Sequence, residues 1–148
     1  MKTVKEILES KPGEVWTISP KAKVIDALRL MSEKEIGALV VMDDTNAVRG
    51  VISERDYARK IALLGKHSDV TAVEEIMTPR GKMVHVSPQT TVEECMVLMT
   101  ARHVRHLPVF DDTRFVGFIS IGDAVKALVT EKEYLIEQLN NYISGKTY

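Results

Sequence analysis

The sequence predicts a mixed α/β (α+β) fold in which two pseudo-symmetric repeats of β-α-β-β-α order pack face to face as one module. The first observation is an internal duplication, because residues 4–61 align with residues 73–128 almost without gaps. The second is that both copies show the same order of helical and strand-like apolar patterns. The third is size: 148 residues suit one compact domain, whereas each copy alone is marginal. We therefore expect the two copies to share one core.

The duplication is clearest around two predicted β-hairpins. Residues 39–45 align with residues 107–113, and residues 50–56 align with residues 117–123 after a one-residue deletion. Two copies are too few for a solenoid, so a symmetric pair is expected, with two equivalent clefts between the repeats.

In the first copy, Val4, Ile7 and Leu8 predict a short amphipathic helix that ends at Lys11-Pro12-Gly13. Apolar spacing then predicts a strand at 15–18, a helix from Val24 to Met31, strands at 38–42 and 48–53, and a helix from 54 through 64 with Ser53 as its N-cap.

The second copy predicts the same elements in the same order. They are a helix at 73–77, a strand at 83–86, a helix at 92–103, strands at 107–110 and 115–120, and a helix at 122–129. A separate last helix, about 132–143, carries Leu135, Leu139, Tyr142 and Ile143 on one side. The predicted organisation is therefore repeat 1 at 4–65, repeat 2 at 73–130 and a C-terminal helix within 131–148.

Composition argues against several classes of partner and site. Twenty basic and 21 acidic residues give a net charge of −1, so we expect neither nucleic acid nor a membrane as partner. The N-terminus lacks a signal-like apolar region and no apolar run reaches the roughly 18 residues of a membrane span, so a cytoplasmic location is expected. The single Cys95 is expected to be a buried small hydrophobe. The four histidines lack the spacing of a metal site, and no Walker loop, GxGxxG or nucleophile elbow occurs.

Three motifs carry a family resemblance: Met77-Thr78-Pro79, residues 105–109 (Arg-His-Leu-Pro-Val) and residues 117–123 (Gly-Phe-Ile-Ser-Ile-Gly-Asp), with residues 50–56 repeating the last. The chain resembles a tandem cystathionine-β-synthase (CBS) domain pair, or Bateman module, of the stand-alone bacterial and archaeal type. The resemblance covers the chain from Val4 to about Val129. It implies a non-catalytic regulatory module that binds AMP, ADP, ATP, or sometimes NAD or S-adenosylmethionine, in clefts between the repeats. It also implies a flat homodimer and a regulated partner protein.

Two Ser-x-x-Asp motifs fit the ribose of such a ligand. Asp56 and Asp123 each follow a serine by three residues at a strand-to-helix junction, where a carboxylate can accept hydrogen bonds from both ribose hydroxyls. Ser53 and Ser120 can either contact the ligand or serve only as helix caps.

The segment before the second hairpin fits phosphate. Arg105 offers a bidentate guanidinium, and His106 would make binding sensitive to pH. Arg102 and His103 are expected on a solvated helix face instead. The first copy has Gly37-Ala38 at the positions of Arg105-His106, so the two clefts are predicted to differ. Arg55, which replaces Gly122 of the second copy, and Lys60 are candidates for a compensating charge.

The resemblance also implies two apolar pockets for adenine. Around Asp123 it places Trp16, Ile36, Gly37, Ala38 and Phe118, and around Asp56 it places Val51, Thr78, Pro79, Val84 and Val104. Trp16 can stack on adenine or be a half-buried core aromatic, and the sequence leaves both open.

Three functions compete at this stage. The first is a nucleotide sensor without catalytic activity. The second is a nucleotide hydrolase, for which His106 is the one candidate base. The third is a structural dimerisation module with ligand-free clefts, against which the presence of both Ser-x-x-Asp motifs argues.

Overall fold

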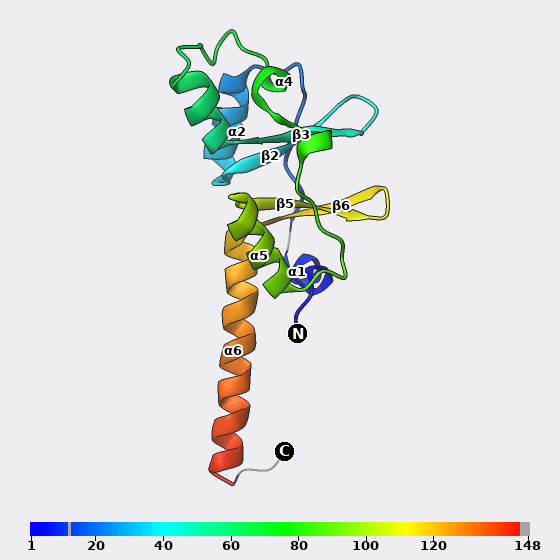
Figure 1. Ribbon diagram of the computed structural model, residues 1–148, viewed down its shortest axis with the longest axis vertical. Coiled ribbons are helices and arrows are strands. Elements are labelled where there is room, and N and C mark those ends of the chain that lie inside the picture. The colour runs from blue at the N-terminus through cyan, green and yellow to red at the C-terminus, as the bar shows by residue number, and fades with distance from the viewer. Residues whose placement is uncertain (12, 146–148) are drawn as a thin grey trace. The chain divides into compact units, whose positions relative to one another are not determined.

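The computed structural model describes residues 1–11 and 13–145, and these fall into two compact units (Figure 1). The central unit spans Glu14–Met83, and the terminal unit joins residues 1–13 to the chain from Val84 onward. Each unit combines a β-sheet with helices, which confirms the predicted mixed α+β class.

The central unit contains a four-stranded sheet in the order β1-β2-β3-β4. Strand β1 (Thr17–Ile18) runs parallel to β2 (Ala38–Met42), while β3 (Val48–Ser53) is antiparallel to both β2 and β4 (Thr78–Pro79). The sequence did not predict β4. Its two residues belong to the Met-Thr-Pro motif and pair with Gly50 and Val51.

Helices cover one face of this sheet. They are α2 (Val24–Lys34), α3 (Glu54–Tyr57) with the π-helical turn η1 (Ala58–Ala62), and α4 (Val73–Ile76), and a 3-10 turn η2 (Arg80–Lys82) follows β4. The strand residues Leu39, Val41 and Ile52 pack against helical residues that include Met31 and Ile76 to form the core. These side chains alternate along the strands, as one buried sheet face requires.

The terminal unit is built on the hairpin of β5 (His106–Asp111) and β6 (Arg114–Ser120). The predicted strand at 83–86 is reduced to an isolated parallel bridge between Val86 and Val109. Helices α1 (Val4–Ser10), α5 (Val92–Arg102) and α6 (Ile121–Ile143) pack on the hairpin. Their core includes Cys95, which is fully buried as expected; burial raises the pKa of its thiol to about 11.

The first helix of each sequence repeat packs in the unit that contains the strands of the other repeat. The Val4 N–H donates to the Thr90 carbonyl at 2.9 Å, and the Val73 N–H donates to the Ala22 carbonyl at 2.8 Å. Sequence repeats and compact units therefore divide the chain differently. The expectation of one shared core is wrong, because the buried apolar residues form two clusters, one in each unit.

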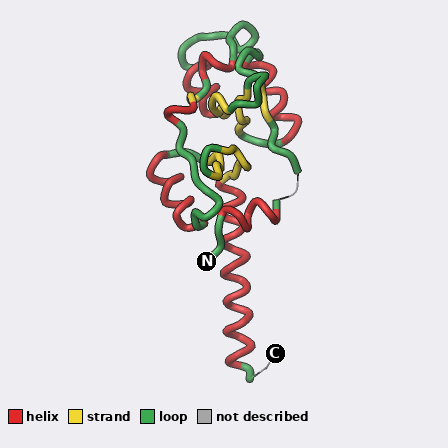
Figure 2. The backbone as a smooth tube through the Cα atoms, turned by 90° about the vertical axis from the view of Figure 1, so that its right-hand side faces the viewer, coloured by secondary structure: helices red, strands yellow, loops and turns green. Residues whose placement is uncertain are grey.

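Helix α6 corrects a second expectation. The sequence was divided into helices at 122–129 and 132–143, but the structure has one 23-residue helix (Figures 1 and 2). No glycine or proline interrupts residues 123–143, so nothing in the backbone ends the helix between the two predicted segments. Neither α6 nor any other helix in the described part of the chain has the length and apolarity needed to cross a membrane.

Candidate functional site

In the central unit, several predicted site residues share the sheet face opposite the helical core. Ala38 pairs with Ser53 across β2 and β3, and Val51 pairs with Thr78 across β3 and β4. Because side chains alternate along a strand, these residues point away from the face that Leu39 and Ile52 bury against the helices. The helices of the unit therefore pack on the other face of the sheet, although Ala38 and Val40 on the predicted site face are also buried.

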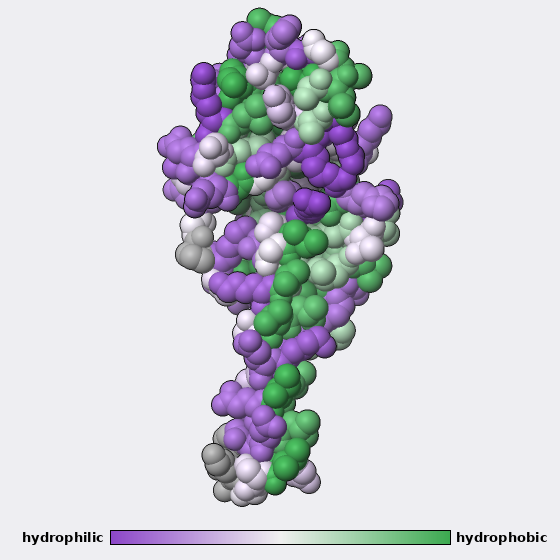
Figure 3. Space-filling view, turned by 90° about the vertical axis from the view of Figure 1, so that its left-hand side faces the viewer, coloured by the Kyte–Doolittle hydropathy of each residue, from purple (hydrophilic) through white to green (hydrophobic). Residues whose placement is uncertain are grey.

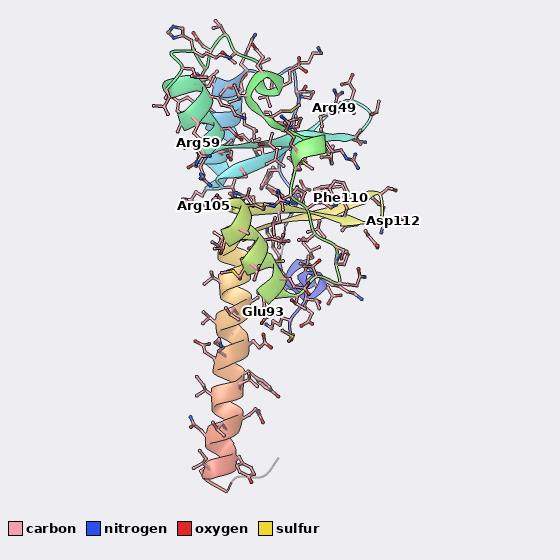
Figure 4. The ribbon with its side chains drawn as sticks, viewed as in Figure 1. Arg49, Arg59, Glu93, Arg105, Phe110 and Asp112 are labelled. Carbon is pink, nitrogen blue, oxygen red and sulfur yellow. The ribbon has the colours of Figure 1, made fainter. Side chains whose placement is uncertain are left out.

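The terminal unit repeats this arrangement. His106 pairs with Ser120, and Phe118 pairs with Pro108, on the face opposite Leu107 and Ile119. The His106 and Phe118 rings stack with centroids 5.5 Å apart and an interplanar angle of 19°. Arg105 is exposed and lies between the end of α5 and the start of β5 (Figure 4).

A capping box fixes the first carboxylate at the β3–α3 junction. The Ser53 backbone N–H donates to Asp56 Oδ2 at 2.9 Å, and the Asp56 N–H donates to Ser53 Oγ at 3.3 Å. Lys60, one turn further along, places its Nζ 3.4 Å from Asp56 Oδ1 and donates to the Ile76 carbonyl at 2.8 Å. The Asp56 side chain is only 14% exposed, so its orientation is well defined by these partners.

The same box forms at the β6–α6 junction with a different cation. The Ser120 N–H donates to Asp123 Oδ2 at 2.8 Å, and the Asp123 N–H donates to Ser120 Oγ at 3.1 Å. Lys11, which follows α1, donates to Asp123 Oδ2 and to the Phe118 carbonyl, both at 2.9 Å. The Asp123 side chain is 23% exposed.

These contacts decide part of the question about the serines. Both are N-caps in capping boxes, so the capping role of Ser53 and Ser120 is confirmed, while a contact with ligand stays a prediction. Both aspartates are the third helical residue of their boxes. A carboxylate can accept further hydrogen bonds beyond those of a cap, so this role leaves room for hydroxyl donors.

The backbone supports the predicted correspondence of Gly37-Ala38 with Arg105-His106. The Gly37 carbonyl accepts from the Glu54 N–H at 3.0 Å, and the Arg105 carbonyl accepts from the Ile121 N–H at 2.8 Å. The equivalent positions therefore have the same backbone role but different side chains, and only the terminal unit has a cation and an imidazole there.

Charge and burial set the protonation states of the terminal-unit site. Burial, assisted by the Lys11 and Arg105 charges and opposed by Asp123, lowers the pKa of His106 to about 4. Burial raises the pKa of Asp123, but the Lys11 and Ser120 hydrogen bonds outweigh it and hold that pKa below its ordinary value. His106 is therefore neutral near pH 7. The expectation that His106 makes ligand binding sensitive to pH stays a prediction.

Trp16 is not a core residue, because its side chain is 37% exposed. The Lys34 ammonium lies 4.2 Å from the centre of its ring, a cation–π contact. Trp16 lies just before β1, and its carbonyl accepts from the Val40 N–H at 3.4 Å. Adenine stacking on this ring stays a prediction, and it would require Lys34 to share or leave the ring face.

The remaining predicted residues are distributed over both units. Thr78 and Pro79 form β4, Ile36 follows the end of α2, and Arg55 and Gly122 lie in the first turns of α3 and α6. Val84 and Val104 belong to the terminal unit, although the family resemblance groups them with Asp56 of the central unit. Each predicted adenine pocket draws residues from both units, so its composition stays a prediction. Arg102 and His103 are exposed, as expected.

Lys11 and Lys34 were not predicted to contact site residues. Lys60 could be found from its i,i+4 spacing to Asp56, but Lys11 and Asp123 are 112 positions apart. Charge pattern alone contains no signal for such a contact, which depends on the packing of α1 in the terminal unit.

A groove of about 650 Å³ borders the Lys11–Asp123 pair, between α1 and the first half of α6. Its charged lining mixes Lys2, Lys11 and Lys126 with Glu6, Glu9 and Asp123. Of the predicted site residues that the structure describes, only Asp123 lines it. Among residues 1–11 and 13–145, no three His, Cys, Asp or Glu side chains gather closely enough to hold a metal ion.

Comparisons with known proteins agree with the duplicated architecture. The CBS domain model matches residues 4–63 and 73–130. The chain is 39% identical over 149 residues to the mitochondrial CBS domain-containing protein CBSX3 of Arabidopsis thaliana, covering 97% of this chain and 72% of that protein.

Two solved structures have a similar fold. A putative signal-transduction protein with CBS domains from Burkholderia ambifaria matches with a TM-score of 0.81 and 45% identity, over 87% of this chain and 95% of that chain. CBSX2, solved in complex with AMP, matches with a TM-score of 0.72 and 27% identity, over 89% of this chain and 99% of that chain.

Proposed function

This chain is a member of the CBS domain family, and on that premise we propose that it is a non-catalytic regulatory module that binds adenosine-containing nucleotides in clefts between its repeats. AMP, ADP, ATP and NAD are the ligands to test first. The AMP complex of CBSX2 supports the class of ligand.

The observation that carries this proposal is the repetition of one Ser-x-x-Asp junction, in each unit beside the sheet face opposite the helical core. In each unit a mostly buried aspartate is held in place by its own helix start. A ribose hydroxyl that donates to such a carboxylate forms a charge-assisted hydrogen bond, worth about 1.5–3 kcal/mol.

The two sites are proposed to prefer different parts of a nucleotide. Arg105 is exposed next to His106 in the terminal unit, whereas the equivalent Gly37 and Ala38 have no polar side chain. Arginine binds phosphate through a planar pair of donors, so phosphate-bearing ligands should favour the Asp123 site over adenosine. Phe118, Trp16 and the other predicted pocket residues are proposed to contact the base.

Regulation would follow if the protein has two conformations and the nucleotide binds one of them more tightly. A nucleotide changes the equilibrium only by as much as its affinity differs between them. We propose that the protein acts as a homodimer whose shape is read by a regulated partner protein.

The decisive experiment is nucleotide titration by calorimetry, with thermal unfolding alongside. A nucleotide at 100 times its dissociation constant should add about 2.7 kcal/mol to the free energy of unfolding. Asp56→Asn and Asp123→Asn should each weaken binding at one site by at least about tenfold, since each removes a charge-assisted acceptor. Asp26→Asn, an exposed aspartate on α2 outside the predicted site residues, is the matched control. Unchanged affinity and stoichiometry in both site variants would contradict the proposal.

The absence of catalysis is tested separately. Prolonged incubation with ATP and with NAD should leave both nucleotides intact when separated by chromatography. Steady formation of product that scales with protein concentration and is lost in His106→Gln would instead favour a hydrolase.

A further inference from the structure

Helix α6 carries an exposed apolar surface that the helices of its own unit do not cover. We define the α6 stripe as Val129, Leu135, Ile136, Leu139, Tyr142 and Ile143, whose exposures run from 47% to 82%. At 100° per residue these six fall on one side of the helix. Figure 3 shows apolar side chains gathered along one side of α6, with hydrophilic side chains interrupting them midway.

The α6 stripe continues the side of the helix that packs on the terminal unit, because Ala124 and Leu135 are only 20° apart at 100° per residue. Ala124 and Ala127 are buried in the core with α1 and α5, and both residues lie in the first third of the helix. From Glu133 to Ile143 the described residues are exposed, apart from the half-buried Gln138 and Asn141. The C-terminal half of α6 therefore extends beyond the core with its stripe unpartnered (Figure 1).

We infer that the α6 stripe binds the α6 stripe of a second copy of this chain, with the two helices antiparallel. The exposed fractions of the six side chains amount to on the order of 700 Å² per copy, close to the roughly 800 Å² that one partner contributes to a standard interface. The inference specifies the surface of the proposed homodimer and does not require nucleotide.

Charge selects the antiparallel arrangement. Lys132 lies within the angular range of the stripe, and it is a charge among apolar positions. A parallel pair in register would place the two Lys132 ammonium groups opposite each other, whereas antiparallel pairing of residues 129–143 moves them apart along the axis. A single lysine in an apolar seam sets register and orientation in this way. The helix dipoles also favour opposite directions.

The composition of α6 argues against a lipid surface as the occupant. Helices that lie on anionic membranes have polar faces rich in lysine and arginine. Over residues 131–143 of α6, Glu131, Glu133 and Glu137 accompany the single Lys132. The α6 stripe of a second copy of this chain fits this surface better than a membrane does.

The test is the mass of the full-length protein by sedimentation equilibrium at micromolar concentration. The wild-type protein should sediment at twice the 16.6 kDa mass of the chain, and Leu135→Glu/Leu139→Glu should weaken association by at least 100-fold and sediment at the single mass. Gln138→Glu/Asn141→Glu adds the same charge to the same helix outside the stripe and should remain dimeric. Circular dichroism must show equal helicity in all three proteins.

Two results would overturn the inference: a monomeric wild-type protein, or a Leu135→Glu/Leu139→Glu variant that remains dimeric. Nucleotide titration of the same variant keeps this outcome separate from the proposed function, because a folded monomer should still bind nucleotide.

Orientation is tested with single cysteines and a short bismaleimide linker. Val129→Cys and Ile143→Cys chains, mixed before linking, should give mainly the mixed dimer if the helices are antiparallel. Efficient linking of each variant to itself would show a parallel pair and contradict the proposed geometry. Buried Cys95, whose thiol pKa is raised, serves as the unreactive background.

Discussion

The central and terminal units use the same capping box but supply its positive charge from different places. In the central unit, Lys60 lies one turn beyond Asp56 on the same helical segment. In the terminal unit, Lys11 reaches Asp123 from the other end of the chain. The two repeats thus share the Ser-x-x-Asp capping box at the strand-to-helix junction. The lysine beside it differs, because the chain after the first helix of each repeat takes a different path.

The continuation differs because the Met-Thr-Pro motif occurs in one copy only. After Ile76 the chain becomes extended and adds β4 to the central sheet, whereas α1 continues as helix to Ser10 and leads to Lys11. Proline cannot continue a helix interior, and the residue before it favours extended backbone. One proline therefore explains a strand in one unit and a bridging lysine in the other.

The largest expected effect compares two equivalent glycines. A Cβ on Gly50 would lie 2.3 Å from the Thr78 carbonyl oxygen of β4, whereas a Cβ on Gly117 would lie 2.6 Å from the flexible Leu8 side chain. Gly50→Ala should lower the free energy of unfolding by about 3 kcal/mol, and Gly117→Ala by about 1 kcal/mol. Urea denaturation of both variants measures this. Equal losses would show that β4 is not a fixed neighbour of β3.

A second prediction uses His106, whose counterpart Ala38 cannot titrate. His106 has a pKa of about 6.5 in the unfolded chain and about 4 in the folded protein. Protonation therefore favours the unfolded chain, and the free energy of unfolding that is present above pH 6.5 falls as the pH is lowered towards 4. After allowance for its partial exposure, the loss should be about 2 kcal/mol. Urea denaturation at several pH values should show this slope in the wild-type protein and a smaller one in His106→Gln. The same slope in both would remove His106 as its cause.

The lysines provide a third comparison. Lys11 makes two hydrogen bonds of 2.9 Å, one of them to a carboxylate. Lys60 makes one hydrogen bond, of 2.8 Å to the Ile76 carbonyl, and lies 3.4 Å from its carboxylate. Lys11→Met should cost about 1 kcal/mol and Lys60→Met about half that, since both ammonium groups are partly exposed. Thermal unfolding at low and high salt should show a larger salt effect for Lys11. A greater cost for Lys60→Met would reverse the proposed difference.

The smallest expected effect concerns a feature that the units share. Glu35 and His103 follow α2 and α5 in left-handed conformation, with φ of 55° and 54°. Glu35→Gly should raise stability by about 0.5 kcal/mol because glycine adopts this conformation without strain. Glu33→Gly, two residues earlier inside α2, should instead lower it by about 1 kcal/mol. Loss of stability in Glu35→Gly would show that the glutamate has compensating contacts.

The sequence predicted elements whose signals are local. Apolar spacing identified α2, α5 and both hairpins, and the serine before each acidic turn identified the starts of α3 and α6. It failed for β4, whose two residues contain no period, and for the continuity of α6, because the repeat ends near Val129 while the helix continues to Ile143.

Contacts between distant residues could not be predicted in the same way. The packing of α1 in the terminal unit requires knowledge of which core accepts Val4 and Ile7, and both cores are equally apolar. The sequence therefore predicted only that Lys11 follows the end of the first helix. The depressed pKa of His106 also depends on burial and on the nearby charges, so residue type alone could not predict it.

Helix α1 packs with the strands of the second repeat and α4 with those of the first, and this affects folding during synthesis on the ribosome. The central unit is complete once Met83 has emerged, although α1 was made before it. At roughly 5–20 residues per second, α1 must wait several seconds for β6 and the start of α6. A gene divided between the two repeats would leave each fragment without a helix that its own core requires, so the halves should fold only when they are expressed together.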